Sequence, residues 1–161
     1  MSKRTIAIIG ATEKIGSVFS KNLAKANYRL LLFDHNEKKL NALVNEIKTS
    51  SPSADIDYMN CVANASWEAD IIIPGVAFGN EKELAEKVKP FANRKVIINF
   101  SSEDLQKILP GAVVVKVSGF DDLGGTNKEI VIDGNEEEAI QIASEMIKAA
   151  GFTAGYFKKN K

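Results

Sequence analysis

The sequence predicts an α/β fold: a single doubly wound, mostly parallel β-sheet with helices on both faces. Short apolar, β-branched runs alternate along the chain with segments whose apolar residues recur at helical spacing. The runs are apolar at consecutive positions, which is typical of strands covered on both sides. The chain has 161 residues and shows no internal repeat or linker, so we expect one domain over 1–161 without a C-terminal substrate domain.

The expected elements follow from these patterns. The segments that predict strands are 5–10, 28–33, 56–61, 70–76, 95–100, 112–117, 129–132 and 152–157. Those that predict helices are 14–26, 81–91, 103–109 and 136–150, and 62–68 is a short connection or helix. Asn36 can cap a further helix whose apolar face is Leu40, Leu43, Val44 and Ile47. Gly151 predicts the end of the last helix, and the glycines and aspartates of 119–127 predict a loop.

The composition excludes several classes of function. Lys plus Arg and Asp plus Glu both total 21, and this balance argues against a nucleic-acid or membrane-binding surface. The single cysteine, Cys61, and the single histidine, His35, exclude an internal disulfide and most zinc sites, so no metal is expected. No run approaches the roughly 20 apolar residues that span a bilayer, and no signal-peptide core is visible. We therefore expect a cytoplasmic protein.

The turn after the first strand is the most informative segment. Ligands of doubly wound sheets bind beyond the carboxyl ends of the strands, where a helix N-terminus can receive a pyrophosphate. The turn consists of Gly10, Ala11, Thr12, Glu13, Lys14, Ile15 and Gly16. Gly10 suits the tight turn and Gly16 the close packing of helix on strand, whereas Glu13 stands where a glycine would let the backbone approach phosphate. The turn predicts dinucleotide binding that Glu13 weakens.

Apart from Glu13, the sequence GATEKIG resembles the GATGKIG turn of NAD(P)-binding reductases with a Rossmann-like fold. Further segments resemble the nucleotide domain of the deazaflavin-dependent NADP reductase family: DIIIPGVAF (70–78), KELAEKVKPF (82–91), KVIINFSS (95–102) and VVVKVSGF (113–120). The resemblance covers about residues 5–157. It implies a reductase that transfers hydride with a nicotinamide dinucleotide, NAD or NADP. The family's helical extension has no counterpart here, so a second subunit would have to close the cleft.

The resemblance also implies positions for the cofactor. The pyrophosphate would contact Thr12, Glu13, Lys14 and Ile15, the ribose end would contact Asp34, His35 and Lys39, and the nicotinamide side would be flanked by Val76, Ala77 and Phe78. An acid at Asp34 suits a bare ribose and repels a 2′-phosphate, which favours NAD over NADP. We identify no catalytic acid–base pair.

Several alternatives remain open from the sequence. The Glu13 carboxylate either extends into solvent or folds over its own helix N-terminus in place of a phosphate. His35 is alternatively a solvated loop residue, Cys61 a small buried hydrophobe, and Trp67 a packing residue. The second functional hypothesis is a non-catalytic Rossmann domain that has weakened or lost dinucleotide binding, carries no cofactor, and acts as a binding or regulatory module.

Overall fold

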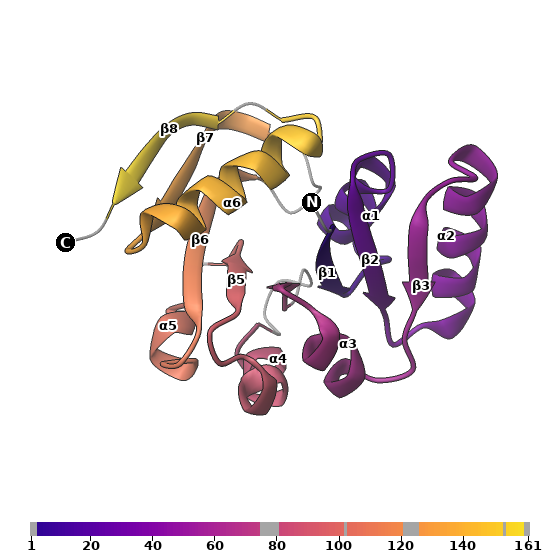
Figure 1. Ribbon diagram of the computed structural model, residues 1–161, viewed down its shortest axis with the longest axis horizontal. Coiled ribbons are helices and arrows are strands. Elements are labelled where there is room, and N and C mark those ends of the chain that lie inside the picture. Colours follow the sequence, from indigo (N-terminus) through magenta and orange to yellow (C-terminus); the bar gives the residue numbers. More distant parts are fainter. Residues whose placement is uncertain (1–2, 75–80, 102, 121–125, 153, 160–161) are drawn as a thin grey trace.

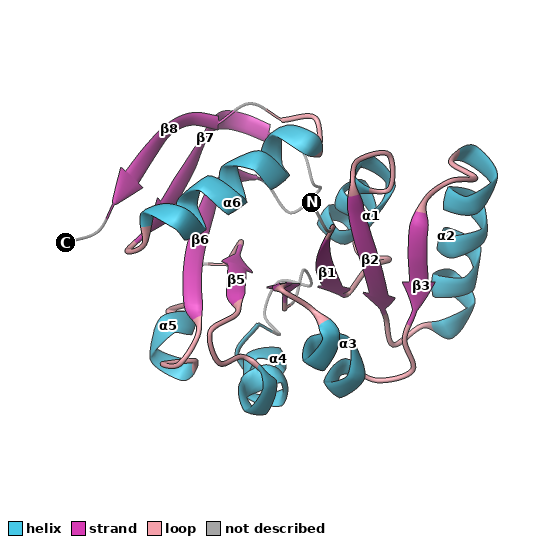
Figure 2. Ribbon diagram, in the orientation of Figure 1, coloured by secondary structure: helices cyan, strands magenta, loops and turns pink. Residues whose placement is uncertain are grey.

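The computed structural model describes residues 3–74, 81–101, 103–120, 126–152 and 154–159, which form an α/β domain (Figures 1 and 2). The strands are β1 (Arg4–Ile9), β2 (Tyr28–Phe33), β3 (Asp55–Tyr58), β4 (Ile71–Ile73), β5 (Val96–Asn99), β6 (Val113–Phe120), β7 (Thr126–Gly134) and β8 (Ala154–Lys159). The helices are α1 (Lys14–Leu23), α2 (Glu37–Ser50), α3 (Val62–Glu68), α4 (Glu81–Val88), α5 (Leu105–Ile108) and α6 (Glu137–Ala149), with a 3₁₀ turn η1 (Lys89–Phe91).

The strands form one eight-stranded sheet in the order β3-β2-β1-β4-β5-β6-β7-β8, and Figure 1 shows β3 and β8 at its two ends. The pairing of β6 with β7 is antiparallel, and the other neighbouring pairs are parallel. Strand order reverses between β1 and β4, the switch point at which ligands of such sheets bind. The predicted fold class is confirmed.

The alternating side chains of each central strand fill two separate cores, which is why the strands are apolar throughout. In β1, Ile6 and Ile8 belong to the core beneath α1, α2 and α6, whereas Ala7 and Ile9 belong to the core beneath α4 and α5. Ile6, Ala7 and Ile8 have no exposed area, and Ile9 is 1% exposed. α1, α2 and α6 thus cover one face of the sheet, and α3, α4 and α5 lie on the other (Figure 1).

The helix boundaries follow local chemistry. The Asn36 side chain accepts a hydrogen bond from the backbone N–H of Lys39 at 3.0 Å, so it caps α2 as predicted. The predicted apolar face of α2 is the buried one: Leu40, Leu43, Val44 and Ile47. α6 ends before Gly151, whose φ of 91° lies in the left-handed region that glycine occupies without strain.

The loop predicted over 119–127 is wrong at both ends. β6 continues to Phe120 and β7 begins at Thr126, because these two residues pair across an antiparallel ladder. The glycine that indicated a loop instead lies at a register shift between Ser118 and Phe120, where Gly119 has a φ of 110°. Glycine is the residue expected at such a bulge.

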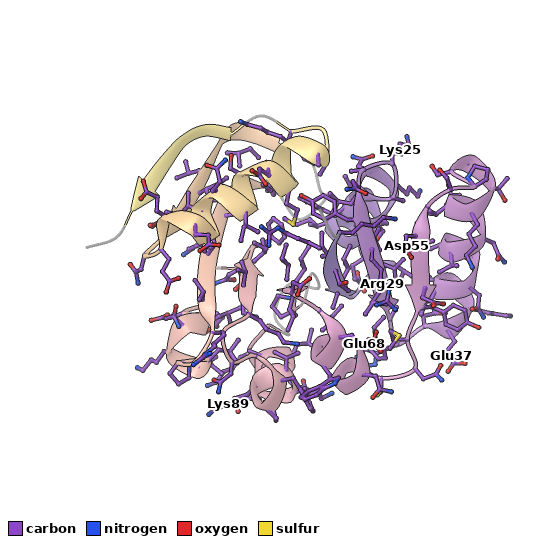
Figure 3. All side chains as sticks on the ribbon, viewed as in Figure 1. Lys25, Arg29, Glu37, Asp55, Glu68 and Lys89 are labelled. Atoms are coloured by element: carbon purple, nitrogen blue, oxygen red, sulfur yellow. The ribbon has the colours of Figure 1, made fainter. Side chains whose placement is uncertain are left out.

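Two packing predictions are also wrong. Trp67 is 71% exposed and not packed in a core; its ring meets only the edge of a neighbouring ring, that of Phe91, at 6.4 Å between centroids. Cys61 is half-buried at the start of α3 rather than enclosed in a core. The same helix is linked to β2 by an ion pair between Arg29 and Glu68 at 3.3 Å (Figure 3). Exposed pairs of this kind contribute at most about 1 kcal/mol.

Among the helices that the structure describes, none combines the length and the apolar character required to cross a membrane.

Candidate functional site

The first turn is tied to the end of the neighbouring strand. The backbone N–H groups of Gly10 and Ala11 both donate to the carbonyl oxygen of Phe33, at 2.9 and 3.0 Å. Gly10 has a φ of 79°, and a Cβ on Gly16 would lie 2.3 Å from the Gly10 carbonyl oxygen. Both glycines are therefore required by the geometry of the turn, Gly10 for its conformation and Gly16 for the close approach of α1.

The N-terminus of α1 opens beyond this turn. The N–H of Glu13 donates to the Gly10 carbonyl at 3.0 Å, and the first helical hydrogen bond runs from the Ser17 N–H to the Glu13 carbonyl at 2.7 Å. Within the part of the chain that the structure describes, the N–H groups of Lys14, Ile15 and Gly16 have no acceptor. These three donors lie at the positive end of a ten-residue helix, a favourable place for an anion.

The Glu13 side chain does not cover these donors. Glu13 is the N-cap residue of α1, it is exposed, and its carboxylate makes no capping hydrogen bond. Of the two conformations left open by the sequence, the one that folds over the helix N-terminus is wrong. The exposed carboxylate leaves the donors uncapped, although the extended N-cap backbone (φ −69°, ψ 166°) is the conformation in which side chains commonly cap a helix.

Asp34 is the buried polar residue of the site. It is 9% exposed, and its Oδ2 accepts hydrogen bonds from the Thr12 N–H at 2.9 Å and from the Thr12 hydroxyl at 2.6 Å. Its Oδ1 accepts a third bond from the Asn36 N–H at 2.9 Å. The carboxylate therefore holds the first turn against the loop after β2, and these bonds compensate for its burial.

A cavity of about 330 Å³ lies at the carboxyl ends of β1 and β2, between this pair of loops and α4. The polar and charged side chains on its wall are Thr12, Glu13, Asp34, His35, Asn36, Lys39, Glu83 and Lys87. Its apolar surface comes from Ile9, Phe33 and Leu84. The cavity is thus lined by carboxylates and ammonium groups together with apolar side chains. Such a lining suits a ligand that combines a flat ring with hydroxyl or phosphate groups.

The expected cofactor residues fall into three groups. Those that line the cavity are Gly10, Thr12, Glu13, Asp34, His35 and Lys39. Ala11, Ile15 and Gly16 are buried and Lys14 is exposed, and none of the four is part of the cavity wall. Val76, Ala77 and Phe78 lie outside the described residues. The His35 side chain is exposed, with its ring edge-on to Phe33 at 5.5 Å between centroids.

The sequence analysis did not include Glu83, Leu84 or Lys87 in the site. All three come from α4, where the Lys87 ammonium lies 3.7 Å from the Glu83 carboxylate. A signal was available, since the helix after β4 faces the first turn across the switch point of a doubly wound sheet. Counting these residues, the wall carries three carboxylates (Glu13, Asp34, Glu83) against two lysines (Lys39, Lys87).

Comparison with known proteins identifies solved structures with a similar fold. No protein-family model matches the chain, and no curated protein matches it. Among solved structures, a 3-hydroxyacyl-CoA dehydrogenase from Archaeoglobus fulgidus aligns with 98% of the chain at 15% identity and a TM-score of 0.71. Pyrroline carboxylate reductase from Plasmodium falciparum, with NADP bound, aligns with 100% at 16% identity and 0.67. An imine reductase from Myxococcus stipitatus, in complex with NADP⁺, aligns with 97% at 13% identity and 0.70.

The chain spans 57%, 59% and 54% of these three structures, respectively. At such low identities the likeness shows the fold alone. The chain therefore shares the Rossmann-like α/β fold of these structures.

Proposed function

We propose that this chain binds a nicotinamide dinucleotide and is an oxidoreductase-like protein, with NAD preferred over NADP. The observation that carries the proposal is the buried Asp34 carboxylate, which lies on the cavity wall next to the open N-terminus of α1. This is where a dinucleotide's ribose and pyrophosphate lie in doubly wound folds. The relatives in fold that hold NADP or NAD⁺ support the same ligand class.

The residues present fit most of such a ligand. The N–H groups of Lys14, Ile15 and Gly16 would hold the pyrophosphate, and Asp34 would accept from the adenosine ribose. A bound dinucleotide supplies hydride chemistry, and the protein's part is to bind and orient it. From the sequence resemblance we further propose a deazaflavin as the second reactant, residues 76–78 beside the nicotinamide, and a second subunit that closes the cleft.

Glu13 opposes the diphosphate. Two unit charges about 4 Å apart repel by roughly 1 kcal/mol in water, and this value applies because the Glu13 side chain is exposed. Against a diphosphate of about two charges the cost is roughly 2 kcal/mol, or about thirtyfold in Kd. Lys14, also exposed, offsets part of it. We therefore expect binding that is weak but measurable.

A thermal-shift titration with NADH and NADPH tests the proposal. A ligand that binds only the folded protein stabilises it by RT ln(1 + [L]/Kd), about 2.7 kcal/mol at a hundredfold excess over Kd. We expect NADH to raise the Tm more than NADPH does, and Glu13→Gln and Glu13→Gly to enlarge both shifts. Glu37→Gln, an exposed acid at the start of α2 that is absent from the cavity wall, is the matched control. The proposal is wrong if neither dinucleotide shifts the wild type or the Glu13 variants.

Hydride transfer is tested separately, by following the loss of NADH absorbance in the presence of a deazaflavin. Transfer above the rate without protein supports an enzyme. Binding without transfer contradicts the deazaflavin assignment and leaves the dinucleotide site standing.

The second candidate is a non-catalytic domain with weakened dinucleotide binding that acts as a binding or regulatory module. It is favoured by the exposed Glu13 on the cavity wall and by the excess of carboxylates over lysines there. It predicts no nicotinamide absorbance in the purified protein and no response to NADH unless Glu13 is replaced.

A further inference from the structure

Trp67, at the end of α3, exposes a large apolar surface. It is 71% exposed, whereas tryptophan is on average one of the well-buried residues of folded proteins. Its indole meets one neighbouring ring, that of Phe91, which is itself half-buried. Tryptophan is enriched at the centres of protein–protein interfaces, where its large rigid ring leaves water. Trp67 therefore marks a surface that the two cores of this domain do not use.

The backbone that carries Trp67 is held in place. The Lys95 ammonium donates hydrogen bonds to the carbonyl oxygens of Ser66 and Trp67, the latter at 2.7 Å. The next residue, Glu68, is ion-paired with Arg29 at 3.3 Å. These contacts join the end of α3 to β2 and to the residue before β5. An anchor that is already fixed loses little conformational freedom when it binds, which favours its use in an interface.

Side chains of opposite charge lie on the two sides of this anchor. Glu68 lies toward β2, where its partner Arg29 is, and Lys89 begins η1, which leads to β5; β1 and β4 separate these two strands in the sheet. Figure 3 shows Glu68 beside α3 and Lys89 beyond α4. Lys89 is exposed and has no ion-pair partner among the residues that the structure describes. We call Trp67, Phe91, Glu68 and Lys89 the Trp67 patch.

The Trp67 patch is complementary to a second copy of itself. A two-fold axis through the indole exchanges the two sides of the patch, so that Glu68 of each copy faces Lys89 of the other. The Glu68 side chain is 43% exposed, and a carboxylate has about four accepting sites, so it can bind a lysine while it keeps Arg29. A partner with charge of one sign would meet a like charge on one side. The formal net charge of the chain is zero, so two copies do not repel each other at long range.

We propose that this chain forms a symmetric dimer through the Trp67 patch, with the two indoles at its centre. A contact of this small size corresponds to a weak dimer that forms at high micromolar concentration. α3 and η1 end where β4 and β5 begin, at the edge of the sheet opposite the cavity at the carboxyl ends of β1 and β2. The dimer therefore leaves both cavities open. It differs from a subunit contact that closes the cleft, and it does not depend on the proposed function.

The protein itself reports this contact, because Trp67 is the only tryptophan of the chain. Sedimentation velocity and tryptophan fluorescence are measured on the same samples, from low micromolar to millimolar concentration. We expect a dimer to form as the concentration rises, and the emission maximum to move to shorter wavelength in parallel as the indole leaves water. A monomer at every concentration overturns the inference. A dimer without a shift in emission also overturns it, since that dimer uses another surface.

Replacement of the anchor is the second test. Trp67→Ala should weaken self-association by at least about thirtyfold, the usual effect of removing a central tryptophan. Because Trp67 is exposed, the variant should remain folded, which thermal unfolding verifies. A folded Trp67→Ala variant that still associates like the wild type overturns the inference.

Charge reversal tests the two-fold arrangement. Lys89→Glu sets carboxylates against each other at both ends of the contact, and Glu68→Lys does the same with ammonium groups. We expect each variant alone to associate at least about tenfold more weakly than the wild type. An equimolar mixture should restore association, because one variant then brings two carboxylates and the other two lysines. A mixture that associates no better than either variant alone overturns the inference.

Lys38→Glu is the matched control for charge. It makes the same change in net charge at an exposed position on α2, which covers the opposite face of the sheet. Alone, it should associate like the wild type. Mixed with Glu68→Lys, it should associate more weakly than the mixture with Lys89→Glu does, although the net charges of the two mixtures are equal. Equal association of the two mixtures would show attraction by net charge alone and overturn the inference.

Discussion

Replacement of Asp34 by Asn tests whether this carboxylate joins the two loops of the site. The amide supplies one oxygen acceptor and one NH₂ donor in place of two acceptors. If the oxygen faces Thr12, the NH₂ meets the Asn36 N–H, and if the amide is flipped, the NH₂ meets the Thr12 N–H. Either way a partly buried backbone N–H loses its acceptor, at a cost of about 1–3 kcal/mol. The surviving bonds also lose the strength that a charged acceptor gives.

We expect Asp34→Asn to lower the free energy of unfolding by about 2 kcal/mol, since removing the desolvated charge offsets part of the loss. Urea denaturation at neutral pH measures it directly, and the Tm should fall by about 4–8 °C for a chain of this size. Asp57→Asn is the control: Asp57 is exposed on β3, and we expect a change within about 0.5 kcal/mol. If Asp34→Asn is as stable as this control, the carboxylate does not hold the loops together and the ribose assignment loses its physical basis.

Two further predictions concern the packing of α1 and a half-buried phenol, that of Tyr28. Gly16→Ala places a Cβ 2.3 Å from the Gly10 carbonyl, so α1 must shift; we expect a loss of about 1–3 kcal/mol in urea denaturation, with Ser17→Ala, one position along, nearly neutral. Burial, and next the Glu145 carboxylate, raise the pKa of the Tyr28 hydroxyl above its usual value near 10. The unfolded chain therefore releases this proton first, and stability is lost as the pH rises through that range. In unfolding measurements from about pH 8 to pH 11, Tyr28→Phe should not show this loss, and identical profiles for the two proteins would contradict the burial argument.

The sequence predicted the sheet and its two helical layers because these depend on patterns that are local. Consecutive apolar residues such as Ile6, Ala7 and Ile8 require cover on both faces, and helical spacing in α2 identifies the same four buried residues that the structure shows. The ends of β6 and β7 were not predictable in this way. They depend on pairing between Phe120 and Thr126, and a glycine at a bulge has the same local signal as a glycine in a loop.

The candidate site was predictable in its location and not in its bonding. Thr12 and Asp34 follow neighbouring parallel strands, so the sequence places both at one edge of the sheet. The hydrogen bonds between them join residues 22 positions apart and depend on the register of β1 against β2. The contribution of Glu83 and Lys87 likewise requires the direction of α4 in space. Spacing along the chain carries neither kind of information.

Glu13 shows why a glycine-rich turn must be judged position by position. Its backbone angles, φ −69° and ψ 166°, lie in the extended region open to any residue, whereas Gly10 needs a positive φ and Gly16 has no room for a Cβ. A glycine at position 13 is therefore not required by the fold, and its role in related turns is the close approach of phosphate. Glu13→Gly should then change stability by only a few tenths of a kcal/mol, the usual cost of glycine at an N-cap. Any larger gain in dinucleotide affinity is attributable to the ligand's charge, and a large loss of stability would show instead that Glu13 holds the turn together.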